Sequence, residues 1–267
     1  MSEDTPIMPM GFACPQCKRL LRSVDNALFC DECNQTYPIV GGIPDFLSHV
    51  NLGLVASRIA KAMDLVAPIY ETRFFTSVLL KLSGVPAGLQ FIERIANFHR
   101  GTLQDIKGTV LDVACGPATY SRRIISPGRE VYGIDISMGV LRQGLTYLGR
   151  EGISGVHLAR ASVEALPFED GVLDGVVCSG SLHLFPDKVL SLREIARTMK
   201  SGAPLSVQTF VSGKTIFNRL IQRQGWLHTF EAGEVQQYLT VAGFEEFQPV
   251  VEGIVLTFSA RKAPRHV

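Results

Sequence analysis

Short apolar segments alternate with stretches of helical periodicity from Thr109 onward, and this alternation constrains the fold more than any other feature. Strands are expected over residues 110–114, 130–135, 156–160, 173–178 and 204–210, and helices over 137–149 and 187–199. A helix over 233–242 precedes two further strands, over 244–250 and 253–261. The pattern predicts an α/β fold. Its core would be a doubly wound, mainly parallel seven-stranded sheet with helices on both faces and a C-terminal antiparallel hairpin.

The rest of the chain divides by composition. Residues 1–11 are expected to be a flexible N-terminus, 12–48 a small turn-rich module, 49–106 a helical linker or lid, and 107–267 the main domain. Pro68 and the Ser-Gly-Val-Pro segment at 83–86 interrupt the helical region, because proline cannot continue a helix.

Composition restricts the function classes. Apolar residues make up 46% and charged residues 19% of the 267 residues, which indicates a packed soluble protein. With a formal net charge of +1, no global attraction to nucleic acid or anionic lipid is expected, although a local basic patch is compatible with this total. The acidic first residues do not resemble a signal peptide, and no run of about 18 apolar residues predicts a membrane span. We therefore expect a cytoplasmic protein.

Four of the six cysteines form two C-x-x-C pairs, Cys14 with Cys17 and Cys30 with Cys33, separated by twelve residues. Each pair places two thiolates on one side of a tight turn, and two such turns complete a tetrahedral sulfur shell for zinc. Four sulfurs leave no position for water, so the predicted zinc is structural and supports a module too small for a sizeable core. A redox dithiol and unpaired thiols are the alternatives.

The segment after the first expected strand has the pattern of a ligand-binding turn. Small residues at 114–118 allow a close approach of the backbone to a ligand. The next strand ends at Asp135, 23 residues after Asp112, where a Rossmann-type fold places a carboxylate for ribose hydroxyls. Asp135 is also a suitable cap for the following helix. A dinucleotide oxidoreductase is the first competitor, but residues 114–119 lack its G-x-G-x-x-G pattern.

Six motifs occur in order along the main domain. They are Leu-Asp-Val-Ala-Cys-Gly at 111–116, Gly-Ile-Asp-Ile-Ser at 133–137, Glu-Ala-Leu-Pro-Phe at 164–168, Leu-Asp-Gly-Val-Val-Cys at 173–178, Leu-His-Leu-Phe-Pro-Asp at 182–187 and Met-Lys-Ser-Gly at 199–202. With this order and spacing, residues 60–261 resemble the class I S-adenosylmethionine-dependent methyltransferases, nearest to the quinone-biosynthesis and small-molecule branch. Residues 37–47 resemble the end of the zinc-ribbon modules found on RNA and small-molecule methyltransferases.

The resemblance implies S-adenosylmethionine as cofactor and assigns residues to its parts. Ala114 and Gly116 would line the methionine part, with Asp112 and Cys115 beside them. Asp135 would hold the ribose diol, Ile136 would lie against the adenine, and Ser162 and Val163 would lie at the adenine edge. Ser179 would face the methionyl end, and Tyr70 would belong to a lid segment. Helix packing is the alternative for Tyr70. The sequence departs from the family pattern at Ala114 and Ala118, where glycines are usual, and at Ser162, where an acid is usual.

The cofactor would supply an activated methyl group, so the protein mainly has to align an acceptor. A base helps with a phenol, enol or amide, and His183 and His228 are the candidates. His183 also fits a structural turn. Cys115 and Cys178 are expected to pack in the core.

Three functions fit these patterns. The first is C- or O-methylation of a hydrophobic small molecule, enclosed by apolar residues such as Phe74, Phe217 and Trp226. The second is base methylation of ribosomal or transfer RNA, because some guanine methyltransferases carry an N-terminal zinc module. Five arginines could form the RNA face: Arg122, Arg123, Arg129, Arg142 and Arg150. The third is a non-catalytic cofactor-binding scaffold whose zinc module recruits a partner.

Overall fold

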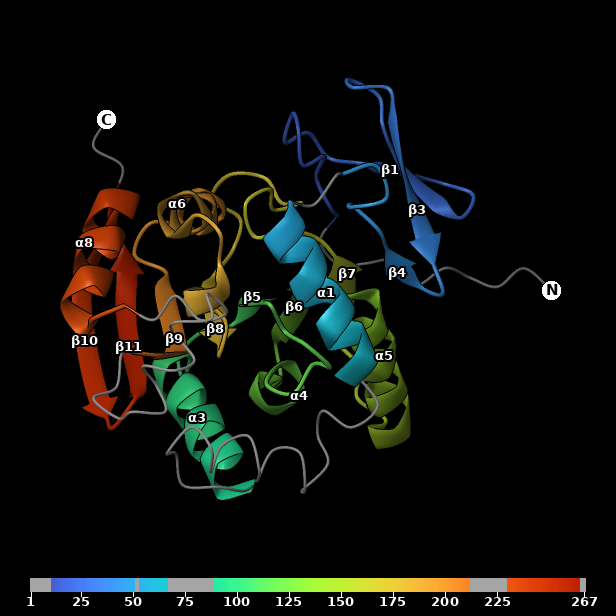
Figure 1. Ribbon diagram of the computed structural model, residues 1–267. Coiled ribbons are helices and arrows are strands. Elements are labelled where there is room, and N and C mark those ends of the chain that lie inside the picture. Colours follow the sequence, from blue (N-terminus) through green and yellow to red (C-terminus); the bar gives the residue numbers. More distant parts are fainter. Residues whose placement is uncertain (1–10, 51–52, 67–88, 212–229, 265–267) are drawn as a thin grey trace.

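The computed structural model of the protein describes residues 11–50, 53–66, 89–211 and 230–264. Its main element is a seven-stranded sheet with the order β10-β11-β9-β8-β5-β6-β7 (Figure 1). The strands are β5 (Gly108–Val113), β6 (Arg129–Asp135), β7 (Val156–Arg160), β8 (Gly175–Ser179), β9 (Pro204–Phe210), β10 (Phe244–Glu252) and β11 (Val255–Lys262). Strands β5 to β9 pair in parallel, and β11 pairs antiparallel with both β9 and β10. The predicted fold class is confirmed.

Helices cover both faces of this sheet. They are α3 (Leu89–Thr102), α4 (Ser121–Ile124), α5 (Met138–Glu151), α6 (Lys188–Thr198) and α8 (Ala232–Ala242). In Figure 1, α3, α4 and α5 lie on one face, and α6 and α8 on the other. Side chains on both faces of the central strands are therefore buried, as Val110, Leu111, Val176 and Val177 show with 0% exposure.

Two strands begin two residues later than predicted, and the one expected over 253–261 starts at Val255. The expected strand over 173–178 starts at Gly175. The reason lies in Asp174, whose carboxylate accepts a hydrogen bond from Thr109 N at 2.9 Å and whose own N–H donates to Thr109 O. The Asp174 side chain thus replaces the first backbone hydrogen bond between β5 and β8.

The N-terminal module is a four-stranded antiparallel sheet beside β7, at the opposite edge of the main sheet from β10 (Figure 1). Its strands are β1 (Arg22–Val24), β2 (Ala27–Cys30), β3 (Gln35–Val40) and β4 (Ile43–Pro44). We call the segment from residue 12 to residue 48, which contains these strands, the ribbon.

The ribbon fills a gap in the helical layers. Residues 161–174, which connect β7 to β8, contain no helix. Aromatic side chains from the ribbon cover this part of the sheet instead. The ring of Phe12 lies 5.6 Å from both Tyr132 of β6 and Phe168, and 5.2 Å from Phe46. The ribbon and the main sheet therefore share one hydrophobic core.

A further helix, α1 (Leu54–Val66), follows the ribbon and lies against α5. Among the described residues, no helix has the length and apolar character needed to cross a membrane.

Candidate cofactor site and metal centre

The turn after β5 has an unusual backbone. Ala114, Gly116 and Ala118 all have positive φ angles, of 54°, 55° and 60°. An alanine in this region costs about 1–2 kcal/mol, so the surrounding structure must hold the turn in place. Strain of this kind is typical of ligand-binding turns, and two of these positions are the ones where the sequence replaces the usual glycine.

Asp135 lies directly against this turn. Its carboxylate accepts hydrogen bonds from Gly116 N and from Ser137 N, each at 2.9 Å. Burial raises the pKa of Asp135 to about 6, and the backbone donors only partly offset this effect. Backbone donors leave part of the roughly four lone-pair positions of the carboxylate open, so the same group can also accept a hydrogen bond from a ribose hydroxyl. The two roles considered for Asp135 are compatible.

A second carboxylate approaches the same place from α1. Asp64 Oδ1 accepts hydrogen bonds from Ser137 Oγ at 2.6 Å and from Gly139 N at 2.8 Å. A Cβ atom on Gly139 would lie 2.7 Å from Asp64 Oδ1 and 3.0 Å from Asp64 Cα, so only glycine allows α1 this close. Asp64 thus ties α1 to the N-terminus of α5, where a negative charge is favourable.

The loop after β7 is the expected adenine edge. Ser162 Oγ accepts a hydrogen bond from Glu164 N at 3.2 Å, while the side chain of Val163 is buried. Ile136, half-buried, follows Asp135. The side chain of Val163 belongs to the core, which leaves its backbone and Ser162 to face a ligand.

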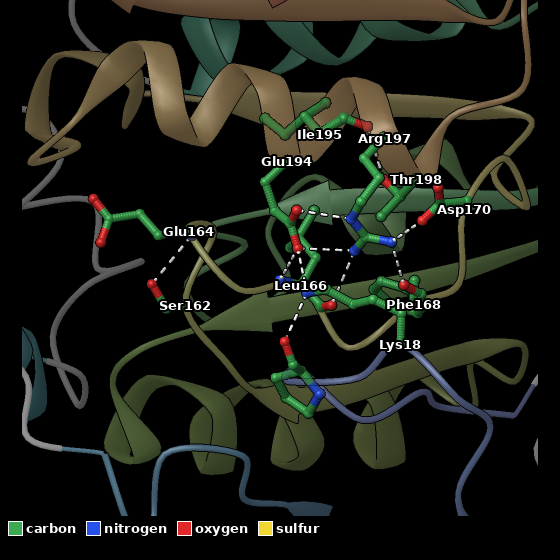
Figure 2. A network of polar contacts seen from close by, with 11 residues as sticks. Lys18, Ser162, Glu164, Leu166, Phe168, Asp170, Glu194, Ile195, Arg197 and Thr198 are labelled. Atoms are coloured by element: carbon green, nitrogen blue, oxygen red, sulfur yellow. Dashed lines mark hydrogen bonds and ion pairs between the residues drawn. The ribbon is translucent and has the colours of Figure 1, made fainter. Parts of the chain in front are cut away.

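The loop is held from outside by α6, as Figure 2 shows. Glu194 accepts hydrogen bonds from Leu166 N at 2.9 Å and from Lys18 Nζ of the ribbon at 2.8 Å. Arg197 binds the same carboxylate and donates to the carbonyl of Phe168. Although burial disfavours its charge, these donors lower the pKa of Glu194. One half-buried carboxylate therefore joins the ribbon, the loop and α6.

Two predicted cofactor residues, Asp112 in β5 and Cys115 in the turn, point into the core. Asp112 is 1% exposed and accepts a hydrogen bond from Ser121 Oγ at 2.6 Å; burial raises its pKa to about 7. Cys115 packs with Leu141 and Leu158, and burial raises the pKa of its thiol. Only the backbone of Cys115 remains for a ligand. Cys115 and Cys178 are both buried free thiols, as expected.

Ser179 ends β8 and contacts a histidine that sequence reasoning missed. His99 of α3 is 0% exposed, and its ring nitrogens lie 2.5 Å from Ser179 Oγ and 2.8 Å from Ser206 Oγ. Burial lowers the pKa of His99 to about 3, so the ring is neutral. The two serines come from neighbouring parallel strands, and His99 fixes the hydroxyl that was assigned to the methionyl end.

The candidate bases differ in position. His183 lies in the short 3₁₀ helix Leu182–Leu184, is 4% exposed, and has Nδ1 3.2 Å from Thr209 Oγ1. Burial lowers its pKa to about 4, so the ring is neutral at pH 7 but a weak base. His228 and Tyr70 lie outside the described residues. The catalytic role of both histidines and the lid role of Tyr70 stay predictions.

The four paired cysteines come together as predicted. All four sulfur atoms lie within 4.8 Å of one another, with 3.9 Å between Cys14 and Cys33 and 3.4 Å between Cys17 and Cys30. A tetrahedron of thiolates around zinc has edges of about 3.8 Å, given Zn–S bonds of about 2.3 Å. The donor set therefore fits a zinc ion.

The turns and the hydrogen bonds support this fit. Each C-x-x-C turn ends in a residue with positive φ, Lys18 at 64° and Asn34 at 51°. Cys33 N donates to Cys30 Sγ at 3.4 Å. Burial disfavours the thiolate of Cys14, but a hydrogen bond with Tyr37 and backbone donors outweigh it and lower the pKa to about 7. Negative charge is therefore stabilised on Cys14, whereas burial raises the pKa of Cys30, and the contact with Cys17 together with burial raises the pKa of Cys33.

The charged residues that link the ribbon to the sheet were also missed by sequence reasoning. Asp45 and Arg160 form an ion pair; outside the ribbon, Asp64 of α1 accepts a hydrogen bond from Gly139 N at the start of α5. No periodicity marks such residues. The charged residue at the end of a mostly apolar strand, Arg160 in β7, was the available signal.

Comparison with known proteins shows which proteins this chain is similar to. Residues 110–202 match a family model described as a methyltransferase domain. An uncharacterized chloroplastic methyltransferase of Arabidopsis thaliana is 24% identical over 282 residues, which cover 94% of this chain and 78% of the relative. The demethylmenaquinone methyltransferase of Anoxybacillus flavithermus is 35% identical over 100 residues. That match covers 36% of this chain and 42% of the relative, less than half its length.

A solved structure shows the same fold. Phosphoethanolamine N-methyltransferase 2 of Haemonchus contortus, in complex with S-adenosyl-L-methionine, matches with a TM-score of 0.63 at 13% identity. The match covers 86% of this chain and 62% of that chain. At this identity the likeness shows the fold, and the matched motifs and the family model carry the enzyme class.

Proposed function

Because the chain belongs to the class I S-adenosylmethionine-dependent methyltransferases, we propose that it methylates a carbon or oxygen atom of a hydrophobic small molecule. The observation that carries the proposal is the strained turn at Ala114–Gly116–Ala118 with the buried Asp135 carboxylate bound to it. A backbone held in this conformation, next to an acid that has free lone pairs, fits an adenosyl ligand without phosphates.

The cofactor-binding roles follow from position. Asp135 would accept hydrogen bonds from the ribose, Gly116 would offer close backbone contact, and Ile136 and Ser162 would border the adenine. The cofactor supplies an activated methyl group when bound. The protein then has to hold the acceptor in line with it and exclude water.

The acceptor class is inferred from two observations. The demethylmenaquinone methyltransferases that match the central segment have, by their name, a hydrophobic quinone precursor as acceptor. The structure also weakens the basis for an RNA acceptor. Arg122 and Arg129 are 8% and 6% exposed, and Arg129 donates to the carbonyls of Leu103 and Ile106 inside the protein. The arginines therefore do not form one exposed face.

We further propose that the four cysteines bind zinc as a structural ion. Four sulfur ligands leave no open position for water or substrate, so the ion stabilises the ribbon and takes no part in the reaction.

Calorimetric titration of the zinc-loaded protein with S-adenosylhomocysteine tests the cofactor. We expect micromolar binding that weakens about 10- to 100-fold in Asp135→Ala, because hydrogen bonds to a charged group contribute ~1.5–3 kcal/mol each. Asp105→Ala, which removes an exposed carboxylate after α3, is the matched control and should bind like the unmodified protein. No binding by the unmodified protein would exclude the proposed activity.

Incubation with S-adenosylmethionine and a panel of hydroquinones, phenols and RNA fragments then tests the acceptor. A mass increase of one methyl group on a hydroquinone or phenol supports the proposal. Methylation of RNA alone would overturn the acceptor class, and tight cofactor binding without any methylated product would favour the scaffold function.

A further inference from the structure

Arg160, the last residue of β7, connects the ribbon to the expected adenosine site. Its Nη1 lies 3.1 Å and 3.3 Å from the two carboxylate oxygens of Asp45, and its Nε donates to the carbonyl of Ile136 at 3.0 Å. The side chains of Arg160 and Asp45 are 24% and 10% exposed. One guanidinium therefore holds the end of the ribbon and the segment that directly follows Asp135.

The backbone makes the same connection. Residue 45 forms a parallel bridge with residue 160, and Phe46 N donates to Arg160 O at 2.9 Å. The next residue, Ala161, donates to the carbonyl of Asp135 at 3.1 Å. The end of the ribbon thus extends the main sheet beyond β7, at the end of the strands where Asp135 lies.

The cysteine cluster lies two side-chain contacts from this junction. Tyr37 Oη is 3.2 Å from Cys14 Sγ, and the ring of Tyr37 lies 5.1 Å from the ring of Phe46. Tyr37 is 4% and Phe46 2% exposed, so both are fixed by close packing. A change in the position of Cys14 therefore reaches Phe46 and its neighbour Asp45 through packed, buried side chains.

We propose that a metal ion in the cysteine cluster increases the affinity of the protein for its adenosyl cofactor, and that Asp45 and Arg160 transmit this effect to Ile136 and Asp135. The inference rests on the proposed function for the identity of the cofactor. Arg160 acts as a positioning residue that does not itself need to touch the ligand. Such coupling is reciprocal, so bound cofactor must increase the affinity for the metal by the same factor.

Two binding measurements on the full chain test the coupling. Calorimetry gives the dissociation constant for S-adenosylhomocysteine before and after zinc is removed with a chelator. Competition against a chromophoric chelator gives the zinc affinity with and without saturating S-adenosylhomocysteine. We expect zinc to strengthen S-adenosylhomocysteine binding about tenfold, within the usual range of coupling energies, and S-adenosylhomocysteine to strengthen zinc binding equally.

Variants locate the path. Arg160→Met keeps the aliphatic stem and loses the three polar contacts, so S-adenosylhomocysteine binding should weaken and no longer depend on zinc. Asp45→Asn tests the same link with a smaller change, should Arg160→Met fail to fold by circular dichroism. Arg261→Met is the matched control, because it removes an exposed ion pair, with Glu246, at the opposite edge of the main sheet. It should leave both affinities and their coupling unchanged.

The outcomes separate the two proposals. If the zinc-loaded protein does not bind S-adenosylhomocysteine, the proposed function fails. If it binds, and binding is lost in Asp135→Ala but is the same with and without zinc, the coupling is overturned while the function stands. Equal coupling in Arg160→Met, Asp45→Asn and the unmodified protein would exclude the path through Arg160.

Discussion

The two edges of the seven-stranded sheet are protected in different ways. At the β7 edge, the ribbon covers the strand end with backbone bonds, the Asp45–Arg160 ion pair and buried aromatic rings. At the other edge, most side chains of β10 are exposed. There the strand is interrupted by an irregularity between residues 245 and 248 and contains Pro249, which has no N–H to offer a further strand.

The comparison shows how an edge can be isolated from the site or connected to it. Strands β11 and β9 separate β10 from β8, and its protection uses only local features of its own sequence. The β7 edge is protected by a distant part of the chain, and the contacts that protect it also border Asp135 and Ile136. We therefore expect changes at the β7 edge to alter cofactor binding, and changes at the β10 edge to remain local.

The largest effect at the β7 edge is expected from loss of a metal ligand. Cys30→Ser removes one of four ligands from a buried position, so zinc content should fall and the free energy of unfolding should decrease by about 3 kcal/mol or more. Metal analysis and thermal unfolding measure both. Cys178→Ser changes a buried thiol elsewhere in the core and should retain zinc. Full stability in metal-free Cys30→Ser would show that the ribbon does not depend on the ion.

Truncating one aromatic ring at each edge gives the next largest effect. Phe12→Ala removes a ring that contacts Tyr132, Phe168 and Phe46, and should lower the free energy of unfolding by about 3–5 kcal/mol. Phe247→Ala removes a half-buried ring of β10 that contacts Phe258, and should cost clearly less. Denaturant unfolding measures both values. Equal costs would contradict the view that the ribbon is part of the main core.

Local patterns predicted most of the fold. The strand over 204–210 and the helix over 187–199 follow from periodicity, and the spacing of the two C-x-x-C pairs alone identified the four sulfurs. The features that sequence reasoning missed are contacts between distant residues. Asp45 and Arg160 are 115 positions apart, and His99 and Ser206 are 107 apart. No local sequence pattern indicates a contact between residues so far apart in the chain. For the same reason the sequence predicted the ribbon as a small module but did not predict that its aromatic residues are part of the core of the main sheet.

A smaller effect is expected from the titration of Asp135, which lies beside the β7 edge. Burial raises the pKa of Asp135 to about 6, and its ionised form is the one that accepts hydrogen bonds from a ribose. Affinity for S-adenosylhomocysteine should therefore rise up to tenfold per pH unit below pH 6 and level off above it. Stability of the unliganded protein changes in the opposite sense. The contribution of Asp135 is fully present below about pH 4 and is lost as the pH rises through 6.

The control for this pH dependence is Asp135→Asn, which cannot titrate. Its affinity should be low and independent of pH between 5 and 8, and the difference in stability from the unmodified protein isolates Asp135 from other groups such as His99. A pH-independent affinity in the unmodified protein would mean that the Asp135 carboxylate does not contact the ligand.

The smallest effect is expected at the β10 edge. Val251 is 50% exposed, and Val251→Thr keeps the β-branched shape, so the free energy of unfolding should change by no more than about 0.5 kcal/mol. The dissociation constant for S-adenosylhomocysteine should be unchanged, because strands β11 and β9 separate this position from the proposed cofactor residues. Denaturant unfolding and calorimetry under identical zinc loading measure the two quantities. A change in cofactor affinity without a change in stability would show that the β10 edge is coupled to the site, and that distance across the sheet does not isolate it.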